Sequence, residues 1–319
     1  MKKLIIICAL TVLFGTGYAR AGTWTILPII PSAIDGSNIV GSSYDGYSEE
    51  LYNLTTGSLT TLNLHVLGSI SGISGNNIVG SCITSIYGGW MDTRGFLYDG
   101  TTKTILNYPG AVATWVNGID GSNIVGSYYD GSVNHGFLYD GTTWTVLDMP
   151  QAVYDTWISG ISGNNIVGYY DHYIDGVGHG FLYNGTSWTT LDIPETMQTL
   201  ISGVSGNNII GSYKELGTGD IHSFFYGGTN WTTVKMLDGI DVTLSGIDGS
   251  NLVGYYRDAS GGTHGFLYVI PEPCTLLLLG LGAVMLKRKS YQKCSYRLSV
   301  YSLQEIRKQR SKEARNVEH

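Results

Sequence analysis

Apolar and polar residues alternate in short runs along most of the chain, and Gly, Asn, Asp and Ser separate the runs. The segment TWISGISGNNIVGYYDHYIDGVGHGFLYNGTSWTTLDIP, residues 156–194, contains four such runs, at Trp157–Ile161, Asn165–Tyr170, Gly180–Tyr183 and Trp188–Leu191. Alternation of this length is typical of β-strands. The turn residues between the runs, above all Asn184-Gly185, indicate hairpins. The segment is therefore predicted to form a four-stranded antiparallel meander.

This pattern recurs along the chain. The phrase IDGSNIVG, or a close variant, ends at Gly41, Gly80, Gly126, Gly168, Gly211 and Gly254, in steps of 39 to 46 residues. A second phrase, HGFLY or a variant, follows each copy, and a third phrase with the pattern of GTTWTVLDMP follows that. A four-stranded unit with a period of about 43 residues is typical of one blade of a β-propeller.

The two ends of the repeat are offset from the blade boundaries. The segment GTWTILPIIP, from Gly22, has the pattern of the third phrase but precedes any first strand, and the last unit stops after HGFLY at Tyr268. Trp24 to Leu27 is therefore predicted to complete the sixth blade and close the ring. Closure hides strand edges, whereas an open stack gains nothing from the offset. We predict an all-β, six-bladed propeller over residues 22–268, with an open or β-solenoid stack as the alternative.

A small residue precedes each copy of the first phrase, and a small polar residue precedes that one. The polar positions are Ser32, Ser71, Asn117, Ser159, Ser202 and Ser245. Small residues allow close approach of backbones, as happens where the inner strands of a propeller converge. We predict that these side chains lie close to the central channel.

Histidines begin the second phrase at His135, His179, His222 and His264, with Arg94 in the same place in the second unit. Imidazole is a common metal ligand, but these residues begin equivalent strands of different blades, so they cannot share one ion. Each is predicted to bond a turn backbone instead. The Asp-Gly pairs at 35, 120, 140, 175 and 248 are best explained as turns, with Asp171 and Asp175 as the best candidates for Ca²⁺ ligands. No cofactor is expected.

Catalytic motifs such as G-x-S-x-G and H-E-x-x-H do not occur in the sequence. The longest variable loop is predicted at Cys82–Arg94, with Trp90 at its tip or over the channel. We expect a protein that is not an enzyme. The alternative, a propeller lyase or hydrolase, predicts carboxylates with shifted pKa values at one mouth of the channel.

Charge and cysteine content exclude further classes. Residues 22–268 carry five Lys and Arg against 21 Asp and Glu. Nucleic acid is therefore not an expected partner, since phosphate binding needs clustered Lys and Arg. The four cysteines, Cys8, Cys82, Cys274 and Cys294, do not form a disulfide framework or zinc motif. Cys82 is predicted to be a small buried residue.

The N-terminus has the pattern of a secretory signal peptide over residues 1–21. Lys2 and Lys3 precede an apolar run, and Ala19 and Ala21 form an A-x-A cleavage site for signal peptidase. The mature chain is expected to begin at Gly22.

The C-terminal segment 269–289 contains Pro271, Glu272 and Pro273, then an apolar stretch from Leu276 to Leu286, then Lys287, Arg288 and Lys289. The apolar stretch is short for a membrane span, and the basic cluster fits a cytoplasmic stop. We predict a short transmembrane helix here. Residues 290–319 form a basic polar tail.

This segment resembles the PEP-CTERM sorting domain, and the repeats are similar to the HAF family of extracellular repeats through HGF at His135, His179 and His264 and HSF at His222. The first resemblance implies recognition of Pro-Glu-Pro by a membrane-embedded exosortase of a Gram-negative bacterium, removal of the apolar tail after transient anchoring in the inner membrane, and delivery to the cell envelope or matrix. We therefore expect a secreted protein with a structural or carbohydrate-binding role toward exopolysaccharide in a biofilm. An unprocessed single-pass membrane anchor is the alternative.

Overall fold

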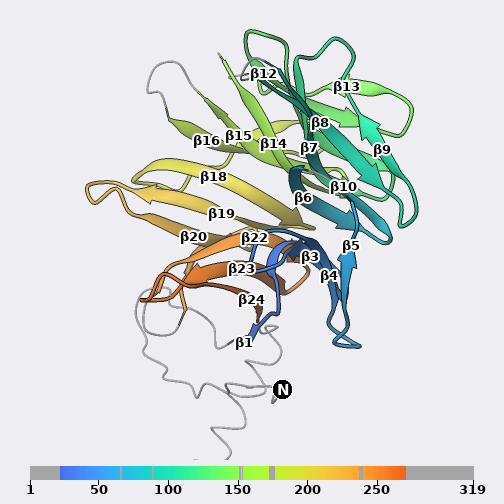
Figure 1. The fold of residues 1–319 in the computed structure, drawn as a ribbon. Helices are drawn as coiled ribbons and strands as arrows, with labels where there is room; N and C mark the ends of the chain where they lie inside the picture. Colours follow the sequence, from blue (N-terminus) through green and yellow to red (C-terminus); the bar gives the residue numbers. More distant parts are fainter. Residues whose placement is uncertain are drawn as a thin grey trace, which may run out of the picture. The chain divides into compact units, whose positions relative to one another are not determined.

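The computed structural model describes residues 22–270, except 65–66, 88–89, 151, 153, 172–176 and 237–239 (Figure 1). Six four-stranded sheets make up this part of the chain. Blade 1 contains β2 (Ile30–Asp35), β3 (Asn38–Ser42), β4 (Glu49–Asn53) and β5 (Leu59–Leu62). Blade 2 contains β6 (Leu67–Ser74), β7 (Asn77–Tyr87), β8 (Trp90–Tyr98) and β9 (Lys103–Leu106). Blade 3 contains β10 (Ala113–Asp120), β11 (Asn123–Tyr129), β12 (Asn134–Tyr139) and β13 (Trp144–Val146).

The remaining blades follow the same order. Blade 4 contains β14 (Thr156–Ser162), β15 (Asn165–Asp171), β16 (Gly178–Tyr183) and β17 (Trp188–Thr190). Blade 5 contains β18 (Thr196–Ser205), β19 (Asn208–Glu215), β20 (Ile221–Tyr226) and β21 (Trp231–Val234). Blade 6 contains β22 (Val242–Asp248), β23 (Asn251–Arg257), β24 (Thr263–Val269) and β1 (Thr23–Ile26). Within each blade every strand is antiparallel to its neighbour, so the meander predicted for each repeat is confirmed.

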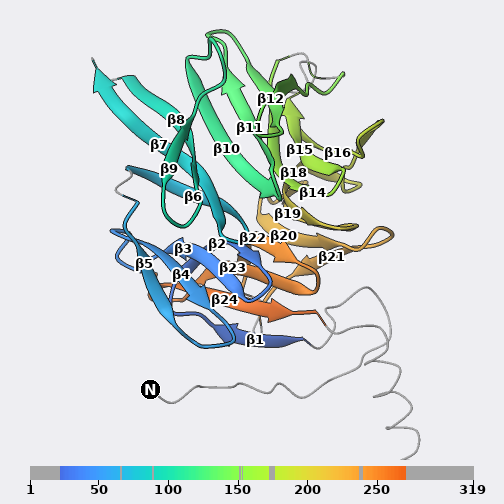
Figure 2. The same cartoon turned by 90° about the vertical axis from the view of Figure 1, so that its right-hand side faces the viewer.

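The N-terminal strand closes the ring, as the offset of the repeats predicts. Strand β1 lies at the edge of blade 6, antiparallel to β24, with Trp24 opposite Tyr268 (Figure 2). The Trp24 ring lies 4.4 Å from the Tyr268 ring and 4.9 Å from the Phe266 ring. Blades 6 and 1 also contact each other directly, because Ser245 Oγ donates a hydrogen bond of 2.7 Å to the carbonyl of Pro31. The open-stack alternative is therefore wrong.

The hydrophobic core is divided into layers between neighbouring blades. One such layer joins Leu147 and Met149 of the connection after β13 to Ile158, Ile166 and Phe181 of blade 4. The Phe of the second phrase is fully buried in blades 2 to 6, at Phe96, Phe137, Phe181, Phe224 and Phe266. The outer-strand Trp of the third phrase packs on that Phe, as at Trp188 and Phe181, whose ring centroids are 5.1 Å apart. Each unit therefore needs its neighbours to bury its apolar faces.

The prediction of a loop at Cys82–Arg94 is wrong, because these residues form strands. These residues continue β7 and β8 as a long hairpin, with Cys82 opposite Arg94 and Tyr87 opposite Trp90. The sequence ITSIY and WMDT is rich in β-branched and aromatic residues, which favour strands over loops. Cys82 itself is buried, as predicted, and burial raises the pKa of its thiol.

The sequence segments outside the propeller lie outside the described residues. These are the signal peptide, the Pro-Glu-Pro segment with its predicted membrane span, and the basic tail. Strand β24 ends at Val269, and Ile270 is still buried in the core of blade 6. Within residues 22–270, the described part contains no helix of the length and apolar character that a membrane crossing requires.

Candidate functional site

The small polar residues of the inner strands are β-bulge residues. In all six inner strands the register with the second strand shifts by one residue, and the skipped positions are Ser32, Ser71, Asn117, Ser159, Ser202 and Ser245. A bulge leaves one residue without a cross-strand partner and bends the strand. All six residues are partly exposed, and each is followed by Gly or Ala.

Several of these side chains join one blade to the next. Asn117 Nδ2 donates to the carbonyl of Ile158 at 2.7 Å, and Ser71 Oγ donates to the carbonyl of Val116 at 2.5 Å. Ser202 donates in the same way to Leu244 at 3.3 Å. These contacts place the residues between adjacent inner strands. Whether they line an open channel stays a prediction.

A second ring of hydrogen bonds links the turns that follow the inner strands. The residue before each turn glycine is Asp or Ser, and its side-chain oxygen accepts a hydrogen bond from the turn glycine N–H of the next blade. The pairs are Asp35–Gly75, Ser74–Gly121, Asp120–Gly163, Ser162–Gly206, Ser205–Gly249 and Asp248–Gly36, at 2.5–3.0 Å. The last pair returns to the first blade. The sequence predicts turns at Asp35, Asp120 and Asp248, but not their bonds to the next blade.

The two ends of the propeller differ in what they offer a ligand. The turn face carries the turns between third and fourth strands and those between first and second strands, and the ring described above joins the latter from blade to blade. The loop face carries the loops between second and third strands and the connections between blades. Among the described residues, the exposed large apolar side chains fall on the outer strands (Ile26, Leu59, Ile105 and Val146) or on the loop face (Tyr44, Tyr47, Met91, Val112, Tyr154, Met197, Leu216, Ile221 and Ile240).

The repeated histidines lie on the loop face and bond carboxylates, so the predicted bonds to turn backbones are wrong. His135 Nδ1 lies 2.8 Å from Asp148 Oδ2, and His179 Nδ1 lies 2.7 Å from Asp192 Oδ2. The other oxygen of each Asp accepts the backbone N–H of the next residue, Gly136 or Gly180, at 3.1 Å. One carboxylate therefore joins the start of the third strand to the connection that leaves the blade.

The same link exists in blade 2 with different residues. Arg94 Nη1 donates to Asn107 Oδ1 at 2.6 Å. The two residues are separated by 13 positions, as are His135 and Asp148. The exchange of a His–Asp pair for an Arg–Asn pair preserves a hydrogen bond at the same place, which supports a structural role for these links in blades 2, 3 and 4.

We expect the His135 link to make stability depend on pH. Burial lowers the pKa of His135, but the hydrogen bonds and charges of Asp148 and Asp130 outweigh it, so the pKa is raised above its usual value near 6.5. A His whose pKa is higher in the folded than in the unfolded protein stabilises the fold fully at pH values below its unfolded-state pKa. This contribution is lost as the pH rises through its folded-state pKa. His135→Gln should therefore cost more stability at pH 5.5 than at pH 9, by less than about 1 kcal/mol for this partly exposed pair. Chemical denaturation at the two pH values measures this. An equal loss at both would contradict it.

The loop between β3 and β4 presents two aromatic side chains on the loop face. Tyr47 is 91% exposed and Tyr44 is 45% exposed. The loop is held by hydrogen bonds, since Asp45 Oδ1 accepts the N–H of Tyr47 at 3.1 Å and Ser43 Oγ accepts the N–H of Ser48 at 3.1 Å. The Ser43 hydroxyl also donates to Asp45 Oδ1, and this bond, followed by that from the Tyr47 N–H, lowers the pKa of Asp45. The hydrogen bonds fix the backbone of this turn, and the Tyr47 ring projects from it into solvent.

Tyr44 connects this loop to the seam between blades 6 and 1. Its hydroxyl donates to the carbonyl of Leu27 at 2.6 Å and accepts the N–H of Gly265 at 3.1 Å. Nearby in blade 6, His264 stacks on Tyr256 with ring centroids 5.1 Å apart, and its Nε2 lies 2.7 Å from Asp258 Oδ2. The seam therefore gathers aromatic rings and a carboxylate on the loop face.

The candidate Ca²⁺ residues are only partly described. Asp171 is the last residue of β15, and the pKa of its carboxyl is raised by burial and then by the charge of Asp155. Asp175 lies outside the described residues. A Ca²⁺ site at this pair therefore stays a prediction.

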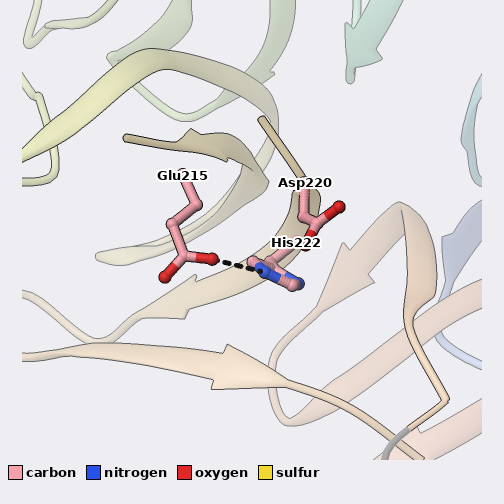
Figure 3. A group of neighbouring side chains, drawn as sticks. All are labelled: Glu215, Asp220 and His222. Atoms are coloured by element: carbon pink, nitrogen blue, oxygen red, sulfur yellow. Dashed lines mark ion pairs between the residues drawn. The ribbon is translucent and has the colours of Figure 1, made fainter. Parts of the chain in front are cut away.

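A different group of possible metal ligands lies on the loop face of blade 5. Glu215 ends β19, Asp220 lies in the loop that follows, and His222 is near the start of β20. One potential ligand atom of each lies within 4.8 Å of the others (Figure 3). Glu215 Oε2 is 3.6 Å from His222 Nε2, while His222 Nδ1 is 2.7 Å from Asp241 Oδ1. The sequence pattern of the histidines suggested only a metal shared among blades, whereas Glu215 and Asp220 lie beside His222 within one blade.

These features define the chain as a closed six-bladed β-propeller with a hydrogen-bonded turn face and an acidic, partly apolar loop face. No family model matches the chain, and no curated protein matches it.

Comparison with solved structures gives distant matches. They include an acylaminoacyl peptidase from Pyrococcus horikoshii, at 13% identity and TM-score 0.47, over 76% of this chain and 44% of that one. The β-propeller domain of the Trilobed protease from Pyrococcus furiosus matches at 12% identity and TM-score 0.46, over 69% and 75%. TolB from Acinetobacter baumannii matches at 13% identity and TM-score 0.48, over 74% and 65%. The chain spans less than half the length of the acylaminoacyl peptidases it matches, and at these scores the likeness says nothing about its activity.

Proposed function

We propose that this chain is a secreted, non-enzymatic propeller that an exosortase sorts to the cell surface or extracellular matrix, where its loop face binds exopolysaccharide. The observation that carries the binding role is Tyr47, which is 91% exposed on a loop fixed by hydrogen bonds. Exposed aromatic side chains on loops are common at binding surfaces, and sugar rings stack on such faces. Asp45 and Asp258 supply carboxylates that accept hydrogen bonds from sugar hydroxyls.

The charge of the propeller restricts the class of polysaccharide. Its body carries 21 Asp and Glu against five Lys and Arg. A polyanionic glycan would be repelled by this surface at low salt. The expected ligand is therefore a neutral, hydroxyl-rich polysaccharide.

Binding is tested on an array of neutral and anionic bacterial exopolysaccharides. Tyr47→Ala should weaken binding at least about tenfold, as expected for an exposed aromatic at the centre of a binding surface. Leu59→Ala is the matched control, because Leu59 is exposed on the outer strand of the same blade. Unchanged binding by the Tyr47 variant would contradict the proposal. Shortening of the glycan on long incubation would favour the lyase or hydrolase alternative.

Sorting is tested separately by mass spectrometry of the mature C-terminus. The Pro-Glu-Pro motif at Pro271, Glu272 and Pro273 supports removal of the tail by an exosortase. In a host with an exosortase, the mature chain is expected to end near this motif. An intact C-terminus at His319 in envelope fractions would contradict processing and favour the single-pass anchor.

A further inference from the structure

We propose that Glu215, Asp220 and His222 form a binding site for a first-row divalent transition-metal ion, with Zn²⁺ as the representative, and that Asp241 orients the imidazole. The three ligand atoms lie within 4.8 Å of one another (Figure 3). Glu215 and Asp220 are exposed, so small rotations of their side chains would bring all three atoms to one ion. Two carboxylate oxygens and one imidazole nitrogen suit ions of this class. The remaining coordination positions would be filled by water, as in open zinc sites.

The residues around His222 orient its imidazole for binding a metal ion. The side chain of His222 is 10% exposed, and its Nδ1 is engaged by Asp241 at 2.7 Å. A carboxylate on the second ring nitrogen is the usual arrangement behind a metal-bound His, because it fixes the tautomer that leaves the other nitrogen free to bind. Lys235 Nζ lies 3.3 Å from the same Asp241 oxygen and anchors that carboxylate.

The other nitrogen of His222, Nε2, distinguishes blade 5 from blades 3 and 6. In blade 6, Nε2 of His264 makes a 2.7 Å hydrogen bond to Asp258, and in blade 3, Nε2 of His135 lies 3.3 Å from Asp130. Nε2 of His222 lies 3.6 Å from Glu215, beyond hydrogen-bonding distance. Nε2 of this largely buried side chain thus faces a carboxylate at a separation that an ion can bridge.

The loop that carries the two carboxylates is a compact turn. Glu215 N–H donates to the carbonyl of Asp220 at 2.9 Å, and Gly219 N–H donates to the carbonyl of Glu215 at 3.1 Å. Thr218 Oγ1 donates to Glu215 Oε2 at 3.0 Å. Glu215 and Asp220 are therefore held at the same end of the β19–β20 hairpin as His222, and both are exposed to an ion arriving from solvent.

The test is Zn²⁺ binding by the intact chain, purified without an affinity tag and stripped of metal. Competition with a chromophoric chelator should show one site that is lost in His222→Gln and weakened at least about tenfold in Glu215→Gln and in Asp220→Asn. Asp241→Asn should weaken it about 10–100-fold without removing a ligand. Mg²⁺ in excess should not compete, since it prefers oxygen ligands and keeps its waters.

His135→Gln is the matched control, because that ring is equivalent by sequence but has both nitrogens within hydrogen-bonding distance of carboxylates, at 2.8 and 3.3 Å. It should leave Zn²⁺ binding unchanged. Near-UV circular dichroism monitors the fold of each protein. If His222→Gln misfolds, the variants at the exposed positions, Glu215→Gln and Asp220→Asn, still test the site. Equal Zn²⁺ binding by the parent, Glu215→Gln and Asp220→Asn proteins, or no binding by the parent, would overturn the proposal. Loss of the metal site with retained glycan binding leaves the proposed function standing.

Discussion

Ile29→Ala is expected to lower the free energy of unfolding by about 2–5 kcal/mol, the range for a large-to-small change at a fully buried site. Ile29 lies in the connection from β1 to β2 and is fully buried. It packs with Ile34 and Ile39 of blade 1 and with Val253 and Leu267 of blade 6. The substitution therefore opens a cavity at the junction that closes the ring.

A matched variant distinguishes the effect of a cavity at the ring closure from the general effect of replacing an isoleucine. Ile26, three positions earlier, is 44% exposed on β1, so Ile26→Ala should change stability by less than about 1 kcal/mol. Both variants are compared with the parent chain by urea denaturation. Similar losses in the two would contradict a special role for the junction, whereas a large loss in Ile29→Ala alone supports it.

The fold could be predicted because each structural signal occurs in several copies. A single IDGSNIVG phrase is weak, but its recurrence at a steady period defines the unit, and the displaced third phrase at Trp24 defines the closure. The residues at the bulges also stand out in the sequence through repetition, since a small polar residue recurs before Gly or Ala in every unit. Why it recurs became clear only from the register, in which that residue has no cross-strand partner.

The links between elements were harder to predict, because they join residues that are distant in sequence. The Asp or Ser before each turn glycine bonds the next blade, as Asp120 does with Gly163, 43 residues away. A turn explains these residues locally, so nothing in one unit indicates the second role. The spacing of 13 residues between His135 and Asp148, repeated from His179 to Asp192 and from Arg94 to Asn107, was a usable signal that the sequence analysis missed.

The candidate metal site could not be predicted from the repeats. Its residues are specific to one blade, so repetition gives no help. Asp241 lies 19 positions after His222, outside the 13-residue spacing, and Lys235 occupies the position that Asp148 has in blade 3. A site that exists in one blade only must arise where that blade departs from the repeat. Such a site is recognised from the structure, because the residues that form it do not recur along the sequence.

The core phenylalanine of the second phrase leads to the other prediction with a large effect. Phe181→Ala should lower the free energy of unfolding by about 3–5 kcal/mol. Phe181 is fully buried, packs edge-on against Trp188, and covers Gly168, where an added Cβ would lie 2.9 Å from the Phe ring. Alanine would leave a cavity between blades 3 and 4 that these neighbours cannot fill without moving the strands.

Blade 1 provides the comparison, because Glu50 occupies the equivalent position. Glu50 is 6% exposed and accepts hydrogen bonds from Ser48 at 2.8 Å and Thr61 at 3.2 Å. Glu50→Ala removes a carboxylate whose burial is itself costly, so its effect should be smaller, below about 2 kcal/mol. Phe181→Glu should be worse than Phe181→Ala, because in blade 4 the equivalent of Ser48 is His179, which is already bonded to Asp192. Denaturation of the three variants measures this order. If Glu50→Ala proves as costly as Phe181→Ala, the buried carboxylate is as important to blade 1 as the phenylalanine is to blade 4.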